Sequence, residues 1–152
     1  MKSHPAKIHT TLARSYFAYY LFSIIGLLAD SIIGFTTPIP FAQTIAISCF
    51  ILGPLLIIWA QRTSSHFRQR GEDKQHAYFK HGPYRLMRNP THLGLVILVT
   101  GYAAISGSAV FLAITVFGYI ISNMLFKRYE SIITEKYGDH YQEYITKVPK
   151  IL

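Results

Sequence analysis

The chain has 152 residues, of which 51% are hydrophobic and only 14% are charged, and its formal net charge is +8 at pH 7. The length predicts a single domain, 1–152, and a charged fraction well below about a quarter argues against an ordinary soluble domain. The basic excess first suggests nucleic acid, but its placement along the chain argues against that partner.

Long apolar segments dominate the chain. Residues 15–35 carry one charge, Asp30, whereas residues 41–60 and 93–126 carry none. About 20 apolar residues cross a bilayer core as a helix, so each of the first two segments predicts one crossing. The third is too long for one crossing and is interrupted by Ser106-Gly107-Ser108, which predicts two helices joined by a tight turn. The sequence therefore predicts an all-α, multi-pass membrane protein with four transmembrane helices at about 15–35, 41–60, 90–105 and 108–126, the last two forming a hairpin.

All fifteen basic residues fall on one side of this topology. They precede the first helix, lie in the connection 61–89, or follow the fourth helix, whereas residues 36–40 and 106–108 contain no Lys or Arg. The positive-inside rule then predicts cytoplasmic N- and C-termini, a cytoplasmic loop 61–89 and a cytoplasmic tail 127–152, in the plasma or inner membrane of a bacterium or the endoplasmic reticulum of a eukaryote. A positive face also attracts anionic headgroups, so membrane lipids are the expected partners and nucleic acid is not.

Two regions outside the apolar segments have readable patterns. Residues 1–11 are expected to form a short polar tail. After residue 126, Tyr137, Tyr141, Tyr144 and Val148 recur at intervals of four, three and four, which predicts a cytoplasmic helix with one aromatic face. Packing of that face at the membrane interface, where Tyr rings are favoured, is the preferred interpretation over substrate contact.

A metal site is not expected. Cys49 is the only cysteine and lies within an apolar segment, where it predicts a small buried hydrophobe. The seven histidines show no zinc-like spacing to a second plausible ligand.

The start of the third predicted helix has a local signal of its own. Asn89 suits the N-cap position and Pro90 the first helical position. About fourteen residues, or ~20 Å of helix, separate Thr91 from the turn, which is short for a ~30 Å hydrocarbon core. The helix start is therefore expected below the headgroup level in a protein-lined cavity, where its N–H groups and positive dipole end suit a carboxylate.

Two sequence blocks flank the predicted hairpin. The first, Gly82–Gly94, has the form G-x-Y-x-x-x-R-[HN]-P-x-x-x-G, and the second begins at Glu130 and continues through Tyr137-Gly138-Asp139-His140-Tyr141 to Val148-Pro149. Their order, over about half of the chain, resembles the isoprenylcysteine carboxyl methyltransferase family of integral membrane enzymes, whose relatives include phospholipid methyltransferases. The resemblance implies S-adenosylmethionine-dependent transfer of a methyl group to a lipid-like or prenylated acceptor, through its carboxylate, thiol or amine.

The resemblance also implies a cofactor site. Position by position it comprises Gln69, His76, Ala77, Tyr78, Phe79, Tyr84, Asn89, Pro90, Thr91, His92 and Glu130. The family prefers His where Asn89 stands and Tyr where His92 stands, and both replacements keep hydrogen-bonding capacity. Arg88 is expected either to bind phosphate headgroups or Glu130, or to belong to a solvated basic face.

Glu130 has the most specific expected role among these residues. Members of the family usually have two adjacent acids here, of which the first is Tyr129 in this chain. The resemblance implies that Glu130 holds the donor's ammonium or ribose, and the rings of Tyr84 and Tyr129 suit its sulfonium, an attraction of ~0.5–2 kcal/mol. A family arginine that engages the substrate carboxylate is replaced by Leu125. Lys127 or Arg128 could substitute for this arginine. The catalytic candidates are therefore Glu130, which would contact the donor, and Arg128, which would contact the acceptor's carboxylate.

Methyl transfer makes modest demands on catalytic groups. It is an in-line displacement, and a carboxylate or thiolate acceptor is already a nucleophile, so alignment and a dry site matter most. Two alternatives remain. An NADPH-dependent membrane sterol-reductase-like enzyme would use a similar C-terminal layout, and a small four-helix transporter would need an acid deep in its first helix, whereas Asp30 lies near the outer end.

Overall fold

The computed structural model of the protein describes residues 4–34, 36–68 and 81–149. These residues form an all-α fold, as predicted, with the single β-bridge between Thr36 and Ser108 as their only extended pairing. The helices are α1 (His4–Ile33), α2 (Ala42–Arg68), the 3-10 helix η2 (Gly82–Arg85), α3 (Pro90–Ser106), α4 (Ala109–Tyr137) and α5 (Asp139–Lys147).

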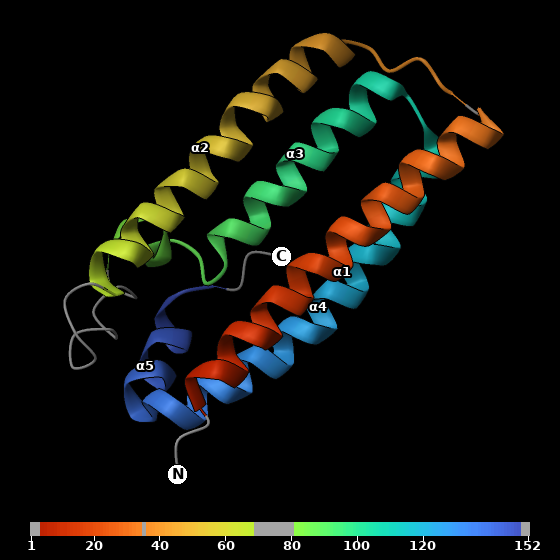
Figure 1. The fold of residues 1–152 in the computed structure, drawn as a ribbon. Coiled ribbons are helices and arrows are strands. Elements are labelled where there is room, and N and C mark those ends of the chain that lie inside the picture. The colour runs from red at the N-terminus through yellow and green to blue at the C-terminus, as the bar shows by residue number, and fades with distance from the viewer. Residues whose placement is uncertain (1–3, 35, 69–80, 150–152) are drawn as a thin grey trace.

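The long helices pack as two pairs, α1 with α4 and α2 with α3 (Figure 1). Glycine permits the close approach within the second pair. A Cβ atom added to Gly53 would lie 2.9 Å from the carbonyl oxygen of Gly94, and one added to Gly94 would lie 2.9 Å from that of Gly53. Small residues at such crossings let helix backbones approach closely, which is the usual basis of helix packing in membranes.

The turn between α3 and α4 forms where the sequence predicts it. Gly107 ends α3 in the left-handed conformation (φ 61°), and the Ser108 side chain caps α4 by accepting a hydrogen bond of 3.0 Å from the Phe111 N–H. However, α3 and α4 do not pack chiefly on each other, as a simple hairpin would imply, because each lies along a different long helix. A main-chain hydrogen bond of 2.7 Å from Thr37 to Gly107 joins the two connections at this end.

Among the described residues, three helices are long and apolar enough to cross a membrane, over Tyr16–Ile33, Ala42–His66 and Ala109–Ile132. The apolar helix α3 is shorter, and its 17 residues span about 25 Å at ~1.5 Å per residue. Since a hydrocarbon core is ~30 Å thick, the fourth crossing stays a prediction. The helix is also sheltered by its neighbours, since Ile105 is its only exposed large apolar side chain.

Three helices extend beyond their predicted ends. The helix α1 begins at His4 rather than after a polar tail, because Pro5 is tolerated in a first turn. The helix α2 continues eight residues past 60, to Arg68, and α4 continues eleven past 126, to Tyr137. Charged residues end an apolar segment but do not end a helix, and neither extension contains Gly or Pro.

The tail contains two helices where the sequence predicts one. Gly138 (φ 54°) ends α4 and precedes α5, so the prediction of a single helix running through Tyr137 and Tyr141 is wrong. Of the predicted aromatic face, Tyr141, Tyr144 and Val148 are all buried within the protein, so this face does not pack at the membrane interface as expected. Figure 1 shows that α5 lies at the same end of the bundle as η2 and the first turn of α3.

Candidate functional site

The N-terminus of α3 is capped as the sequence predicts. Pro90 occupies the first turn, and Asn89 Oδ1 accepts a hydrogen bond of 3.3 Å from the His92 N–H. The same oxygen accepts a bond of 3.1 Å from the Tyr16 hydroxyl on α1. Asn89 is only 8% exposed, and its Nδ2 has no hydrogen-bond partner in the described part of the chain. Because two donors fix the oxygen, the amide nitrogen is held pointing away from them.

His92 connects the two helix pairs one turn further along α3. Its side chain is buried, and its Nε2 lies 3.2 Å from Ser122 Oγ on α4. Its ring stacks on Tyr119 at 5.4 Å between centroids and meets the edge of Tyr19 at 5.6 Å. Such aromatic and polar contacts between helices fix the depth at which the start of α3 sits against α1 and α4.

Tyr84 on η2 lies beside this helix start. Burial raises the pKa of its phenol, while side-chain hydrogen bonds with Thr91 and Ser64 act in the opposite direction. Its carbonyl oxygen accepts a hydrogen bond of 2.7 Å from the Tyr144 hydroxyl. Tyr84 is therefore a neutral phenol at physiological pH, held between α2, α3 and α5.

Arg88 joins the segment before α3 to both α4 and α5. Its Nε and NH2 groups donate to the carbonyl oxygens of Val148 at 2.8 Å and Ile145 at 2.7 Å. Its NH1 group donates to Glu130 Oε1 at 3.3 Å, with both side chains less than a fifth exposed. Of the two partners expected for Arg88, the structure shows Glu130.

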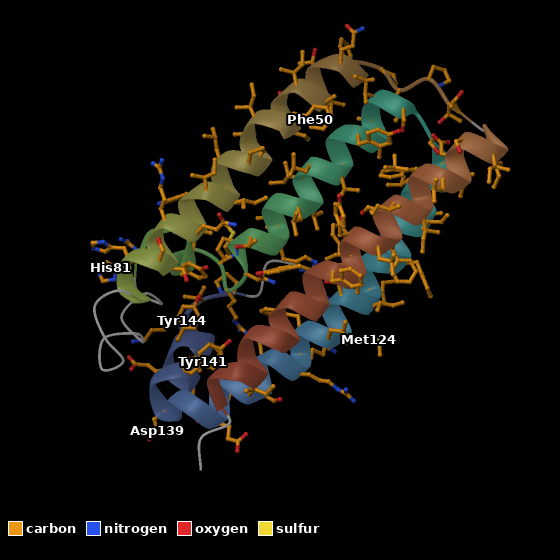
Figure 2. The ribbon with its side chains drawn as sticks, viewed as in Figure 1. Phe50, His81, Met124, Asp139, Tyr141 and Tyr144 are labelled. Atoms are coloured by element: carbon orange, nitrogen blue, oxygen red, sulfur yellow. The ribbon has the colours of Figure 1, made fainter. Side chains whose placement is uncertain are left out.

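The aromatic residues of α5 complete this end of the bundle. Tyr141 and Tyr144 lie on the inward side of α5, close to η2 (Figure 2), with ring centroids 5.7 Å apart. Burial raises the pKa of both phenols, and the charge of Glu130 raises that of Tyr141 further. The Tyr144 hydroxyl thus stays protonated and keeps its hydrogen bond to η2.

The structure brings together part of the predicted site. Tyr84, Asn89, Pro90, Thr91 and His92 surround the start of α3, and Glu130 reaches the same segment through Arg88. Arg128 and Lys127 are exposed on α4, and Leu125 is partly buried. Five predicted residues lie outside the described residues, namely Gln69, His76, Ala77, Tyr78 and Phe79, as does the side chain of Tyr129.

Sequence reasoning missed several polar residues here, of which Tyr16, Ser122 and Asn123 matter most. Each is a polar side chain inside a long apolar segment, which is itself a signal of function or of specific helix pairing. Among the described residues, no group of three or more His, Cys, Asp or Glu side chains is placed to hold a metal ion.

The arrangement suits a ligand with an anionic end. A helix N-terminus presents N–H groups and a positive dipole end to such a ligand, and the Asn89 amide adds a buried donor without a partner at this place. The carboxylate of S-adenosylmethionine fits this donor set.

These features define an α-helical membrane-protein fold with a polar site at one end of its helices. The sequence model described as phospholipid methyltransferase matches residues 41–140, so the chain belongs to the phospholipid methyltransferase family. It is 29% identical over 101 residues to protein-S-isoprenylcysteine O-methyltransferase A of Arabidopsis thaliana, a match that covers 64% of this chain and 50% of that protein. The chain thus spans about half the length of this curated relative. No solved structure matches the chain significantly.

The family match confirms the resemblance inferred from the two sequence blocks. It covers α2, α3 and α4 and includes the whole first block. Together with three helices long enough to cross a bilayer, it indicates an integral membrane protein.

Proposed function

We propose that the protein is an S-adenosylmethionine-dependent methyltransferase that acts within the membrane on a lipid-like or prenylated acceptor. The observation that carries the proposal is the buried Asn89 amide, which has no partner among the described residues and lies at the capped start of α3. This feature lies inside the region matched to the family. The relative's name supports a prenylated cysteine acceptor, and the family's name supports a phospholipid; the reacting group is a carboxylate, thiol or amine.

The donor's carboxylate is placed at the start of α3, next to Asn89 and Thr91. Tyr84 offers a ring face for the sulfonium, and Glu130, positioned by Arg88, contacts the donor's ribose or ammonium. The segment that contains Gln69, His76, Ala77, Tyr78 and Phe79 completes the binding site in this proposal. Arg128 stays a weaker candidate for the acceptor's carboxylate, because its exposed position requires the acceptor to approach from outside the helix pairs.

When bound, S-adenosylmethionine supplies an electrophilic methyl group. The residues of the chain then hold the donor in line with the acceptor and keep water away, which is the main requirement of such a displacement. His92, buried between the pairs, fixes the position of α3 against α4 and hence the distance between Asn89 and Glu130 across the site. A carboxylate or thiolate acceptor needs no strong general base in this arrangement.

Topology forms part of the proposal. We place both termini, loop 61–89 and the site on the cytoplasmic side, with α3 as a fourth, shorter crossing. The Thr37–Gly107 hydrogen bond supports a common side for the two uncharged connections. The sterol-reductase and transporter alternatives are not favoured, because the family match points to methyl transfer.

Equilibrium binding to the detergent-purified protein tests the proposal. S-adenosylmethionine and S-adenosylhomocysteine are expected to bind, each displacing the other, while NADPH does not compete. Tyr84→Ala should weaken both, and Tyr20→Ala, at an exposed ring on α1, should weaken neither. Binding of NADPH in preference to both sulfur compounds would move the assignment to the reductase class.

A further inference from the structure

Two carboxamide side chains, the buried Asn89 and the half-buried Asn123, each have one buried atom without a partner in the described chain. One is Nδ2 of Asn89, a hydrogen-bond donor, and the other is Oδ1 of Asn123 on α4, an acceptor. Buried polar atoms in native proteins are nearly always hydrogen-bonded, and each exception needs an explanation. Leaving one unpaired destabilises the folded state, because the atom loses its bond to water and gains none in return.

The register of α4 places Asn123 opposite the start of α3. It follows Tyr119 by four residues and precedes Glu130 by seven, so the three share one face of the helix. At one end of this face Tyr119 stacks on His92, and at the other Glu130 binds Arg88. Asn89 lies between His92 and Arg88 in the sequence, so Asn123 faces the segment that carries it.

The two atoms do not satisfy each other, since neither has a partner in the described chain. Together they leave one donor at the start of α3 and one acceptor on the facing side of α4. A matching ligand group must therefore have an acceptor next to a donor. An α-amino acid has this combination, a carboxylate that accepts and an ammonium that donates from adjacent positions.

The charges around the site favour the same ligand. Among the Lys and Arg side chains that the structure describes, Arg88 is the only one that is largely buried, and it is engaged by Ile145, Val148 and Glu130. The carboxylate must then be held by neutral donors and the positive end of α3, as at other helix N-termini. Glu130 is already paired with Arg88, so the ammonium group of the ligand needs another acceptor.

We propose that Asn89 and Asn123 together hold the amino-acid end of the methyl donor. Asn89 Nδ2 donates to its carboxylate, and Asn123 Oδ1 accepts from its ammonium, so Asn123 is a donor-binding residue and Glu130 is left to the ribose. The inference rests on the proposed function, because it requires that the donor is S-adenosylmethionine.

The test compares two ligands that differ in the amino-acid end. S-adenosylhomocysteine has it, and 5′-methylthioadenosine lacks it, and the affinities of both are measured on the purified protein. Asn123→Leu should weaken S-adenosylhomocysteine about tenfold or more, as for loss of a charge-assisted hydrogen bond, and leave 5′-methylthioadenosine within about twofold. Asn123→Asp keeps the acceptor oxygen and should restore binding of S-adenosylhomocysteine.

Two controls exclude a loss of fold. Met124→Ala changes the next residue of α4, whose side chain is 64% exposed and points away from the other helix pair (Figure 2), and should bind both ligands as wild type does. The thermal midpoint of ligand-free Asn123→Leu should match that of wild type or exceed it, because Leu removes an unpaired buried oxygen.

An equal loss of affinity for both ligands, or no loss for either, would overturn the assignment of Asn123. In both cases wild-type protein still binds S-adenosylhomocysteine, and the proposed function stands. Wild-type protein that binds neither ligand would contradict the proposed function itself, and the assignment of Asn123 with it.

Discussion

Arg88 holds Glu130 at 3.3 Å while its other nitrogens bind the last carbonyl groups of α5. One side chain thus fixes three parts of the chain, namely the segment before α3, the end of α4 and the end of α5. The carbonyl groups at a helix C-terminus lack partners within the helix and favour a positive group nearby. Arg88 therefore holds the tail over the start of α3, together with the Tyr144 hydroxyl and its hydrogen bond to Tyr84.

Arg88→Gln should release α5 from the start of α3. The change removes charge-assisted hydrogen bonds, each worth about 1.5–3 kcal/mol when formed, and the amide protons of residues 139–148 should exchange faster as a result. Hydrogen exchange followed by mass spectrometry measures this. Lys147→Gln is the matched control, because its pair with Glu143 is more than half exposed and contributes at most about 1 kcal/mol. Equal protection of α5 in Arg88→Gln and wild type would contradict the role given to Arg88.

Glu130→Gln should weaken binding of the methyl donor. Gln keeps the size of the side chain but loses the charge that strengthens its hydrogen bonds, a loss of ~1.5–3 kcal/mol or roughly ten- to hundredfold in affinity. Titration with S-adenosylmethionine measures the effect, and Glu135→Gln at an exposed position of the same helix should change little. Small and equal effects of the two changes would leave Glu130 as a partner of Arg88 only.

Asn89→Asp distinguishes the role of Asn89 in capping α3 from its proposed role in binding the donor. Asp keeps an oxygen that accepts from Tyr16 and His92, and it suits a helix N-terminus, so the thermal midpoint should be unchanged or higher. The substitution replaces the amide donor with a negative oxygen, so affinity for S-adenosylhomocysteine should fall at least tenfold. Asn89→Ser, which keeps a cap without the charge, should show a smaller loss. Wild-type affinity in Asn89→Asp would remove Asn89 from the donor site.

Tyr144→Phe should destabilise the tail in a way that depends on pH. The lost hydrogen bond to Tyr84 is worth about 0.5–1.5 kcal/mol. Because burial raises the pKa of the Tyr144 phenol, its contribution is complete below its unfolded value of about 10 and is lost as the pH rises through the folded value. The difference in thermal midpoint between wild type and Tyr144→Phe should be constant from pH 6 to about 9 and shrink above about 10. A difference that grows with pH would contradict this assignment.

Reporter fusions test the proposed topology. A reporter after Leu152 or within the loop near Gly71 should give a cytoplasmic signal, and insertions at Thr37 or Gly107 should give the opposite one. A common side for Gly71 and Gly107 would remove α3 as a crossing.

The fold was predictable where a local pattern determines it. Apolar length predicted the long helices, and Asn89-Pro90 and Ser106-Gly107-Ser108 predicted the start and end of α3, because caps and turns depend on neighbouring residues. The helices α2 and α4 continue beyond the predicted membrane segments, since a change from apolar to charged residues marks the edge of a membrane segment and leaves helix propensity intact. The break between α4 and α5 was not predicted, because it depends on the positive φ of a single residue, Gly138.

The candidate site was predictable only in part, for a similar reason. The residues of the first block are neighbours in sequence, and one of the two partners expected for Arg88 was Glu130. Tyr16, Ser122 and Asn123 were missed because their role depends on how α1 and α4 are aligned against α3. Helical periodicity indicates which residues share a face but does not fix the register between helices distant in sequence.

Methyl transfer itself tests the central claim most directly. Purified protein is incubated with tritium-labelled S-adenosylmethionine and either phosphatidylethanolamine vesicles or N-acetyl-S-farnesylcysteine, and label in the lipid-extractable product is counted. Methyl transfer to at least one of these two acceptors is expected, with a loss of activity in Asn89→Asp and none in Met124→Ala. No transfer to either acceptor by protein that also fails to bind S-adenosylmethionine would contradict this claim.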